Sequence, residues 1–139
     1  MERPVAIETC LGELRFRDCI FLDSVRQDER GDLTFSGEIN ADLTSKGREN
    51  RQGKKWIPYT LTFQRVCACF SCELDTYENL VGNGAFAGSD FDVMENSRWL
   101  KALPVRKDFP KESCRHYRLF TYDMVYHIIA ASYQMEVNL

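Results

Sequence analysis

The sequence has no apolar run of about 18 residues, the length that a membrane-spanning helix requires. Its first residues lack a basic region followed by a long apolar stretch, so we expect no signal peptide and a cytoplasmic location. The formal net charge is −3, without the basic excess that is typical of nucleic-acid-binding and membrane-surface proteins. Neither a membrane nor a nucleic acid is therefore the expected partner.

Signatures of common catalytic sites are also missing, because no G-x-S-x-G, H-E-x-x-H, P-loop or EF-hand pattern occurs. The only two histidines are His116 and His127. Cys114 and His116 would share one face of a strand, so a cysteine–histidine nucleophile pair is an alternative. We expect instead that Arg115, His116 and Arg118 form the wet face of that strand, and that His127 points to solvent. No catalytic residue is predicted, and enzymatic activity is kept as the alternative.

Six cysteines occur at spacings that do not suggest a disulfide framework, and we expect them to remain thiols. Three of them lie together as C-A-C-F-S-C, at Cys67, Cys69 and Cys72. With a fourth ligand from elsewhere, these thiolates could bind zinc or copper, but no second C-x-x-C or H-x-x-x-H pair follows. The preferred interpretation is small apolar side chains within a strand. We therefore predict no metal and no cofactor, and metal binding by the three thiols remains an alternative.

Residues 79–89 (NLVGNGAFAGS) predict a glycine-rich loop. Residues 82–87 satisfy G-x-G-x-x-A, a fingerprint of dinucleotide-binding proteins. The preceding residues 74–79 do not form the pattern of a buried parallel strand, and the chain lacks repeated strand–helix–strand units. We therefore expect a plain loop without a cofactor.

Alternation of apolar and polar residues is the main structural signal. The predicted strands are 5–10, 13–25, 33–40 and 57–74. The second and third should form an antiparallel hairpin with Gly31 in its turn. A bulge is expected near Asp18 and Cys19, and another near Arg65, where the apolar residues change from one face of the strand to the other.

Residues 90–103 predict a helical region, in which Ser97 caps a short final helix that Pro104 ends. Residues 114–139 predict a strand, a helix over 123–131 and a closing strand, because apolar residues within 125–129 fall at i, i+3 and i+4. The alternative, one strand over 117–137, would have about 20 residues and exceed the usual strand length.

The chain length predicts a single domain over 1–139, with a core that needs neither disulfides nor metal. The predicted fold class is α+β: mainly antiparallel β sheet, or a partly open barrel, with one or two short helices.

Residues 44–55 have no apolar side chain and predict a mobile surface loop. Its basic residues are Lys46, Arg48, Arg51, Lys54 and Lys55. They could contact phosphates, but Glu49 interrupts them and no aromatic residue alternates with them before Trp56. A solvated loop is the preferred interpretation.

Two groups of acidic residues flank the glycine-rich loop. They are Glu73, Asp75 and Glu78, and Asp90, Asp92 and Glu95. If the fold brings them together, they would form an acidic face that docks a basic protein. The preferred interpretation of these residues on their own is ordinary solubility charge, and the docking face is the alternative.

The tail HYRLFTYDMVYHIIAASY, residues 116–133, resembles the ends of small bacterial proteins found with polymorphic toxins, some of which are assigned as immunity proteins. The same group often has a segment similar to SRWL, residues 97–100, shortly upstream. The resemblance implies a small α+β or mainly β domain that acts by binding and has no enzymatic role. It carries no catalytic motif, so it transfers no functional residue.

Three functional hypotheses follow. The first is a non-enzymatic protein-binding domain, for example an immunity-type inhibitor of a basic toxin domain. The second is a small-ligand pocket or enzyme, built where Cys19, Cys67, Tyr59 and the glycine-rich loop meet. The third is a metal-bound module that uses the three clustered cysteines. The oligomeric state is left open.

Overall fold

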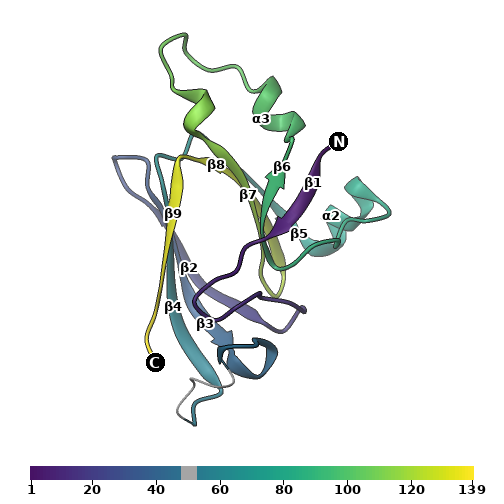
Figure 1. The fold of residues 1–139 in the computed structure, drawn as a ribbon, viewed down its shortest axis with the longest axis vertical. Helices are drawn as coiled ribbons and strands as arrows, with labels where there is room; N and C mark the ends of the chain where they lie inside the picture. The colour runs from purple at the N-terminus through teal and green to yellow at the C-terminus, as the bar shows by residue number, and fades with distance from the viewer. Residues whose placement is uncertain (48–52) are drawn as a thin grey trace.

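The computed structural model describes residues 1–47 and 53–139. They form two antiparallel sheets with short helices at one side (Figure 1). The five-stranded sheet has the order β1-β6-β7-β8-β5, and the four-stranded sheet has the order β2-β3-β4-β9. The predicted α+β class with mainly antiparallel sheet is confirmed, and the described sheets do not close into a barrel.

The strands are β1 (Arg3–Ala6), β2 (Ile20–Gln27), β3 (Leu33–Asn40), β4 (Trp56–Gln64), β5 (Ala68–Glu73), β6 (Phe91–Glu95), β7 (Arg115–Phe120), β8 (Met124–Ala130) and β9 (Ser132–Val137). The helices are α2 (Leu74–Val81) and α3 (Arg98–Ala102), with 3-10 turns η1 (Ala41–Leu43) and η2 (Lys111–Ser113). None of the described helices is long and apolar enough to cross a membrane.

A bent two-stranded ribbon joins the sheets. β4 pairs with β9 as far as Gln64–Ser132, and β5 pairs with β8 from Ala68–Ile129. Between these pairs, the three residues 65–67 lie opposite the two residues 130–131, so the segment from β4 to β5 has one extra residue. Within it, Arg65 has a positive φ of 55°. The predicted bulge near Arg65 is therefore confirmed, and it is the point at which the chain passes from one sheet to the other.

Aromatic side chains fill the space between the two sheets. Phe63 on β4 lies with its ring centroid 5.6 Å from Phe35 of its own sheet. The same ring lies 5.9 Å from Phe91 and 5.3 Å from Tyr117, both on the five-stranded sheet. Phe35, Phe63 and Phe91 are fully buried. Burial of such rings is the main source of stability that holds the sheets together.

The segment between β1 and β2 closes the open side of the two sheets. Leu11, Leu14 and Cys19 from this segment are buried in the same core. Leu14 also forms an isolated bridge with Thr44, which is itself buried. The predicted surface loop over 44–55 is thus anchored at its first residue, and its basic residues 48 and 51 lie outside the described residues.

The predicted strand over 13–25 is wrong in its first half. Phe16 has φ 82°, and its carbonyl accepts a hydrogen bond from the Cys19 amide at 3.1 Å, so the chain turns there. β2 begins only at Ile20, and its irregularity lies between Leu22 and Ser24, where the register with β3 shifts. The expected bulge near Asp18 and Cys19 is therefore a turn. The hairpin of β2 and β3 itself is confirmed.

The predicted helix over 123–131 is wrong, because these residues form β8. Ile128 faces the core between the sheets, whereas Val125 and Ile129 face the opposite side, and all three are fully buried. A strand buried on both faces loses its alternation, so the spacing of its apolar residues imitates a helix. The predicted helical region 90–103 is wrong in its first part for the same reason, because Phe91–Glu95 form the strand β6. Its final part is confirmed: Ser97 caps the short helix α3.

Candidate functional site

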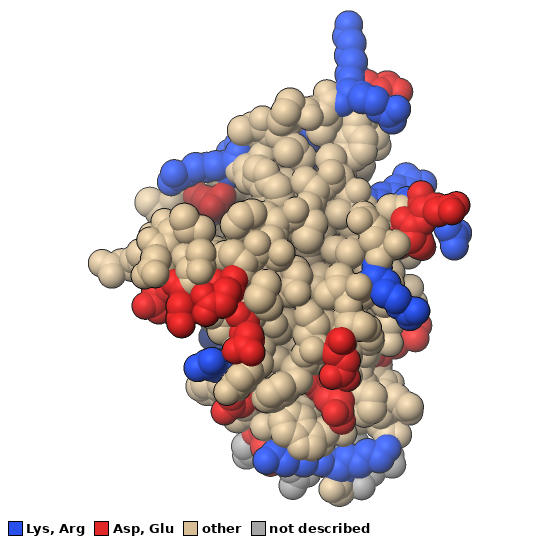
Figure 2. Space-filling model, turned by 180° about the vertical axis from the view of Figure 1, so that it is seen from behind, with Lys and Arg blue, Asp and Glu red and all other residues tan. Residues whose placement is uncertain are grey.

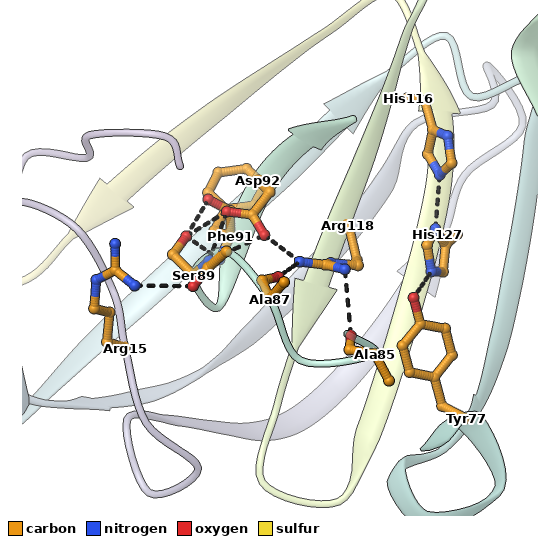
Figure 3. Close-up of polar contacts among 11 residues, drawn as sticks. Arg15, Tyr77, Ala85, Ala87, Ser89, Phe91, Asp92, His116, Arg118 and His127 are labelled. Carbon is orange, nitrogen blue, oxygen red and sulfur yellow. Dashed lines mark hydrogen bonds and ion pairs between the residues drawn. The ribbon is translucent and has the colours of Figure 1, made fainter. Parts of the chain in front are cut away.

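A layer of polar side chains covers the face of the five-stranded sheet that points away from the core. It contains Asp92 of β6, His116 and Arg118 of β7, and His127 of β8 (Figure 3). The covering elements are α2, α3 and the loop Gly82–Ser89, here named the glycine loop. α2, which the sequence did not predict, begins where the Glu73 carboxylate accepts the Thr76 amide hydrogen.

Arg118 and Asp92 form a buried ion pair. Their side chains are 2% and 0% exposed, and Nη2 lies 2.6 Å from Oδ2. Arg118 also donates hydrogen bonds to the carbonyls of Ala85 and Ala87 in the glycine loop. Its Nε is buried and has no hydrogen-bond partner among residues 1–47 and 53–139. The guanidinium therefore connects the sheet to the loop, at the cost of one unsatisfied donor.

Asp92 holds the end of the same loop. Its Oδ1 accepts hydrogen bonds from the Ser89 amide at 2.9 Å and from the Ser89 hydroxyl at 2.6 Å. Gly88 has φ 95° and packs directly against Asp92 and Pro4. A Cβ added at Gly88 would lie 2.6 Å from Asp92 Oδ2 and 2.9 Å from Pro4 Cβ. Only glycine fits both this space and this backbone conformation.

Gly88→Ala is accordingly expected to lower the free energy of unfolding by about 1–3 kcal/mol, because the new methyl group displaces the ion pair and strains the backbone. Urea unfolding followed by circular dichroism measures this loss. Gly84→Ala is the matched control: it shares a positive φ, but an added Cβ there would meet nothing within 4 Å. Equal losses at the two glycines would show that the close approach at Gly88 does not matter.

Four side chains form a continuous hydrogen-bonded row across the sheet. Ser97 Oγ lies 2.6 Å from His116 Nδ1, and His116 Nε2 lies 2.7 Å from His127 Nδ1. His127 Nε2 lies 3.0 Å from the Tyr77 hydroxyl on α2. The row thus links the cap of α3, through β7 and β8, to α2, and one proton on each imidazole satisfies every contact.

Both histidines are held neutral. Burial, followed by the charge of Arg118, lowers the pKa of His116 to about 4. Burial, then His116 and Arg118, lower the pKa of His127 to about 3, against a small opposing effect of Glu2. An uncharged pair is the state in which the row of hydrogen bonds is intact.

The predicted solvent-exposed face of β7 is wrong for His116, which is 4% exposed, and for Arg118, which is 2% exposed. Arg115 is exposed, as predicted. His127 is half-buried rather than directed to solvent. The alternative nucleophile pair does not form either: the ring nitrogens of His116 contact Ser97 and His127, and the nearest acceptor of the Cys114 thiol is the Pro110 carbonyl at 3.9 Å. One feature of the sequence could have indicated the polar layer: Asp92 lies between apolar residues in the segment that forms β6, so its side chain is buried.

A pocket of about 360 Å³ lies beside the polar layer. Its lining includes Arg15, Phe16, Arg17, Phe86, Asp90 and Phe120. Burial, followed by the charge of Asp92, raises the pKa of Asp90 to about 8, although Arg15 and Arg118 oppose the shift. The carboxyl group of Asp90 is therefore mostly protonated at neutral pH.

The predicted meeting of Cys19, Cys67 and Tyr59 with the glycine loop does not occur. Cys19 and Tyr59 are buried in the core between the sheets, where burial raises the pKa of both side chains. The glycine loop lies on the opposite face of the five-stranded sheet, and Cys67 is half-buried at the bend before β5. The pocket described above is thus formed by different residues.

Cys69 and Cys72 lie on the edge strand β5, and Cys67 lies just before it. Cys69 is exposed, and Cys67 and Cys72 are half-buried. The expectation of small buried side chains within a strand is therefore wrong, since none of the three is fully buried. Within the described ranges, no three histidine, cysteine, aspartate or glutamate side chains are close enough to hold a metal ion. Gly82 and Gly84 follow a helix rather than a strand, so the dinucleotide fingerprint lacks its required context.

The predicted acidic face divides into separate parts. Asp92 is buried in its ion pair, Glu95 pairs with Arg3 at 2.7 Å, and Asp90 lines the pocket. The first group, Glu73, Asp75 and Glu78, remains exposed on and beside α2. Figure 2 shows acidic side chains gathered on the flank where α2 lies.

Exposed apolar side chains accompany these carboxylates. Leu80 is 67% exposed, and Val81 and Phe86 are each 49% exposed. Residues 66–97 contain six acidic residues and no lysine or arginine. We name this surface the acidic flank; it consists of Glu73, Asp75, Glu78, Leu80, Val81 and Phe86.

Comparisons of the chain with protein-family models, with curated proteins and with solved structures found no match.

Proposed function

We propose that the chain is a non-enzymatic protein-binding domain that docks a basic protein on its acidic flank. The resemblance of residues 116–133 to bacterial proteins found with polymorphic toxins supports an immunity-type role in a bacterial cytoplasm, with a basic toxin domain as the partner. The observation that carries the proposal is the presence of exposed carboxylates and exposed apolar side chains on one element that the sheet holds in place.

The buried polar layer supports this role because it positions the acidic flank. Tyr77 connects α2 to His127, and Arg118 connects the glycine loop to the sheet. Buried ion pairs seldom add net stability compared with apolar residues of similar size. Their effect here is to fix a surface helix and loop in one arrangement. A preorganised surface binds a partner with a smaller loss of conformational entropy.

The charge of the acidic flank selects a basic partner. Asp75 and Glu78 lie on α2, within residues 66–97, which contain no lysine or arginine. The nearby Arg15 and Arg17 are paired with Glu13 and Asp123. An acidic helix of this kind accelerates association with a basic protein and repels acidic ones. The exposed Leu80 and Phe86 supply apolar anchors, and burial of side chains of this type contributes most of the affinity at protein interfaces.

The test is affinity capture with the purified chain, followed by binding measurements on the purified partner with a charge-reversed variant, Asp75→Lys/Glu78→Lys. We expect the captured partner to be basic, and its affinity to fall at least about tenfold in the variant, mainly through slower association. Raising the salt from about 50 mM to about 500 mM should weaken the native complex and have little effect on the residual binding of the variant.

The matched control is Glu38→Lys/Glu136→Lys, which reverses two exposed charges on the outer face of the four-stranded sheet. This variant should bind the partner as the native chain does. A partner that binds both variants equally well would contradict the proposal, as would an acidic partner.

A further inference from the structure

Three phenylalanines line the pocket beside the glycine loop. Phe16 and Phe86 are exposed and Phe120 is buried, with the Phe86 and Phe120 ring centroids 5.7 Å apart. The volume of about 360 Å³ is at the lower end of the range for small-molecule sites. It accommodates a ligand with one or two rings rather than a nucleotide or a sugar chain.

Phe16 contributes little to the fold that holds it. Its side chain is 66% exposed, and its φ of 82° is a conformation that bulky residues rarely adopt. Glycine would form the same turn without strain, since only the Phe16 carbonyl takes part in the turn hydrogen bond to Cys19. A large aromatic side chain in a strained backbone conformation, exposed at a pocket, is therefore a candidate for contact with a ligand.

Two arginines supply hydrogen-bond donors at the pocket. Arg15 pairs with Glu13 at 2.7 Å and also donates to the Gly88 carbonyl at 2.9 Å. Arg17 pairs with Asp123 at 3.4 Å and also donates to the Tyr122 carbonyl at 3.2 Å. Each guanidinium has five N–H donors, so both have donors to spare for a ligand. Asp90, which is protonated at neutral pH because burial raises its pKa to about 8, supplies an O–H donor as well.

We propose that this pocket binds a small aromatic carboxylate, with its ring between Phe16 and Phe86 and its carboxylate directed to Arg15 and Arg17. Aromatic rings bind a flat ligand by stacked or edge-to-face contact, and guanidinium groups match the geometry of a carboxylate. An aromatic amine is expected to bind more weakly, because the guanidinium groups of Arg15 and Arg17 line the pocket whereas their carboxylate partners, Glu13 and Asp123, do not. The pocket shares Phe86 with the acidic flank but contains none of its carboxylates, so ligand binding can be tested without the proposed protein partner.

The test is calorimetric titration of the native chain with phenylacetate and indole-3-acetate, with phenethylamine and acetate as ligand controls. We expect at least one of the two aromatic acids to bind, and the amine and acetate to bind at least about tenfold more weakly. Phe16→Gly should weaken binding of the acid about tenfold or more while the fold, checked by circular dichroism, is unchanged. Arg17→Gln should reduce the preference for phenylacetate over its uncharged amide.

Arg26→Gln is the control variant, since Arg26 is an exposed arginine on β2, whose sheet contributes no residue to the pocket lining. It should bind the aromatic acid as the native chain does. The proposal is overturned if neither acid binds at millimolar concentration, if the amine binds as tightly as the acid, or if Phe16→Gly and Arg17→Gln leave binding unchanged. It is also overturned if Phe16→Gly affects only the binding of a protein partner, which would assign the pocket to the protein interface.

Discussion

Replacing Arg118 by methionine is expected to lower the free energy of unfolding by about 3–5 kcal/mol, because it leaves Asp92 as an uncompensated charge inside the protein. Asp92 is 0% exposed and cannot regain water where it lies. The substitution also removes the hydrogen bonds that Arg118 donates to Ala85 and Ala87. The glycine loop should therefore loosen along with the loss of stability.

Urea unfolding gives the loss of stability, and hydrogen exchange of residues 85–89 shows whether the loop loosens. Arg3→Met is the matched control, because it breaks the Arg3–Glu95 pair, whose side chains are 69% and 45% exposed. That change should cost less than about 1 kcal/mol. Adding Asp92→Leu to Arg118→Met should restore part of the stability, since it removes the unpaired charge. A loss under about 1 kcal/mol for Arg118→Met alone would contradict the description of a buried ion pair.

The sequence was sufficient to predict the sheets wherever a strand has one buried and one exposed face. The alternation in β3 and β4 is of this kind, and even the bulge at Arg65 follows from the change of face. It was not sufficient for β6 and β8, which are buried on both faces. There the local pattern lacks the two-residue alternation of a strand, and only the packing of distant elements decides between strand and helix.

The polar layer was missed for the same reason. Arg118 and His116 alternate with Tyr117 and Leu119, which is the pattern of a strand with a wet face. Whether that face is exposed to solvent depends on α2 and the glycine loop, which come from about 30 to 40 residues upstream and lie over it. The partner of a buried charge cannot be read from neighbouring residues, because the Asp92–Arg118 pair spans 26 positions. The exposed acidic residues around α2 were predictable, since their exposure needs no partner.

Lowering the pH from about 6.5 to about 4.5 is expected to destabilise the protein by about 2 kcal/mol, and the two histidines are the cause. In the unfolded chain an imidazole takes up a proton below about pH 6.5, whereas in the folded protein the pKa is about 4 for His116 and about 3 for His127. Unfolding therefore takes up protons in this window, and each histidine lowers the free energy of unfolding by about 1.4 kcal/mol per pH unit.

Asp90 acts in the opposite direction over the same window. Its pKa is about 8 in the folded protein, against the ordinary aspartate value of 3.8, so the folded protein retains a proton that the unfolded chain has released. Its contribution to stability therefore increases as the pH falls, by about 1.4 kcal/mol per unit, and cancels that of one histidine. Asp90→Asn removes this opposing effect, and the acid-induced loss should then grow to about 4.5 kcal/mol.

The double variant His116→Gln/His127→Gln should reverse the sign of the pH dependence. Without the two imidazoles, the effect of Asp90 dominates, and stability should stay level or rise between pH 6.5 and 4.5. Urea unfolding at several pH values measures the three curves, and NMR titration of the imidazole protons follows His116 and His127 directly. Titration of either histidine near pH 6.5 in the folded protein would contradict the neutral, hydrogen-bonded row from Ser97 to Tyr77, and with it the arrangement that fixes α2 to the sheet.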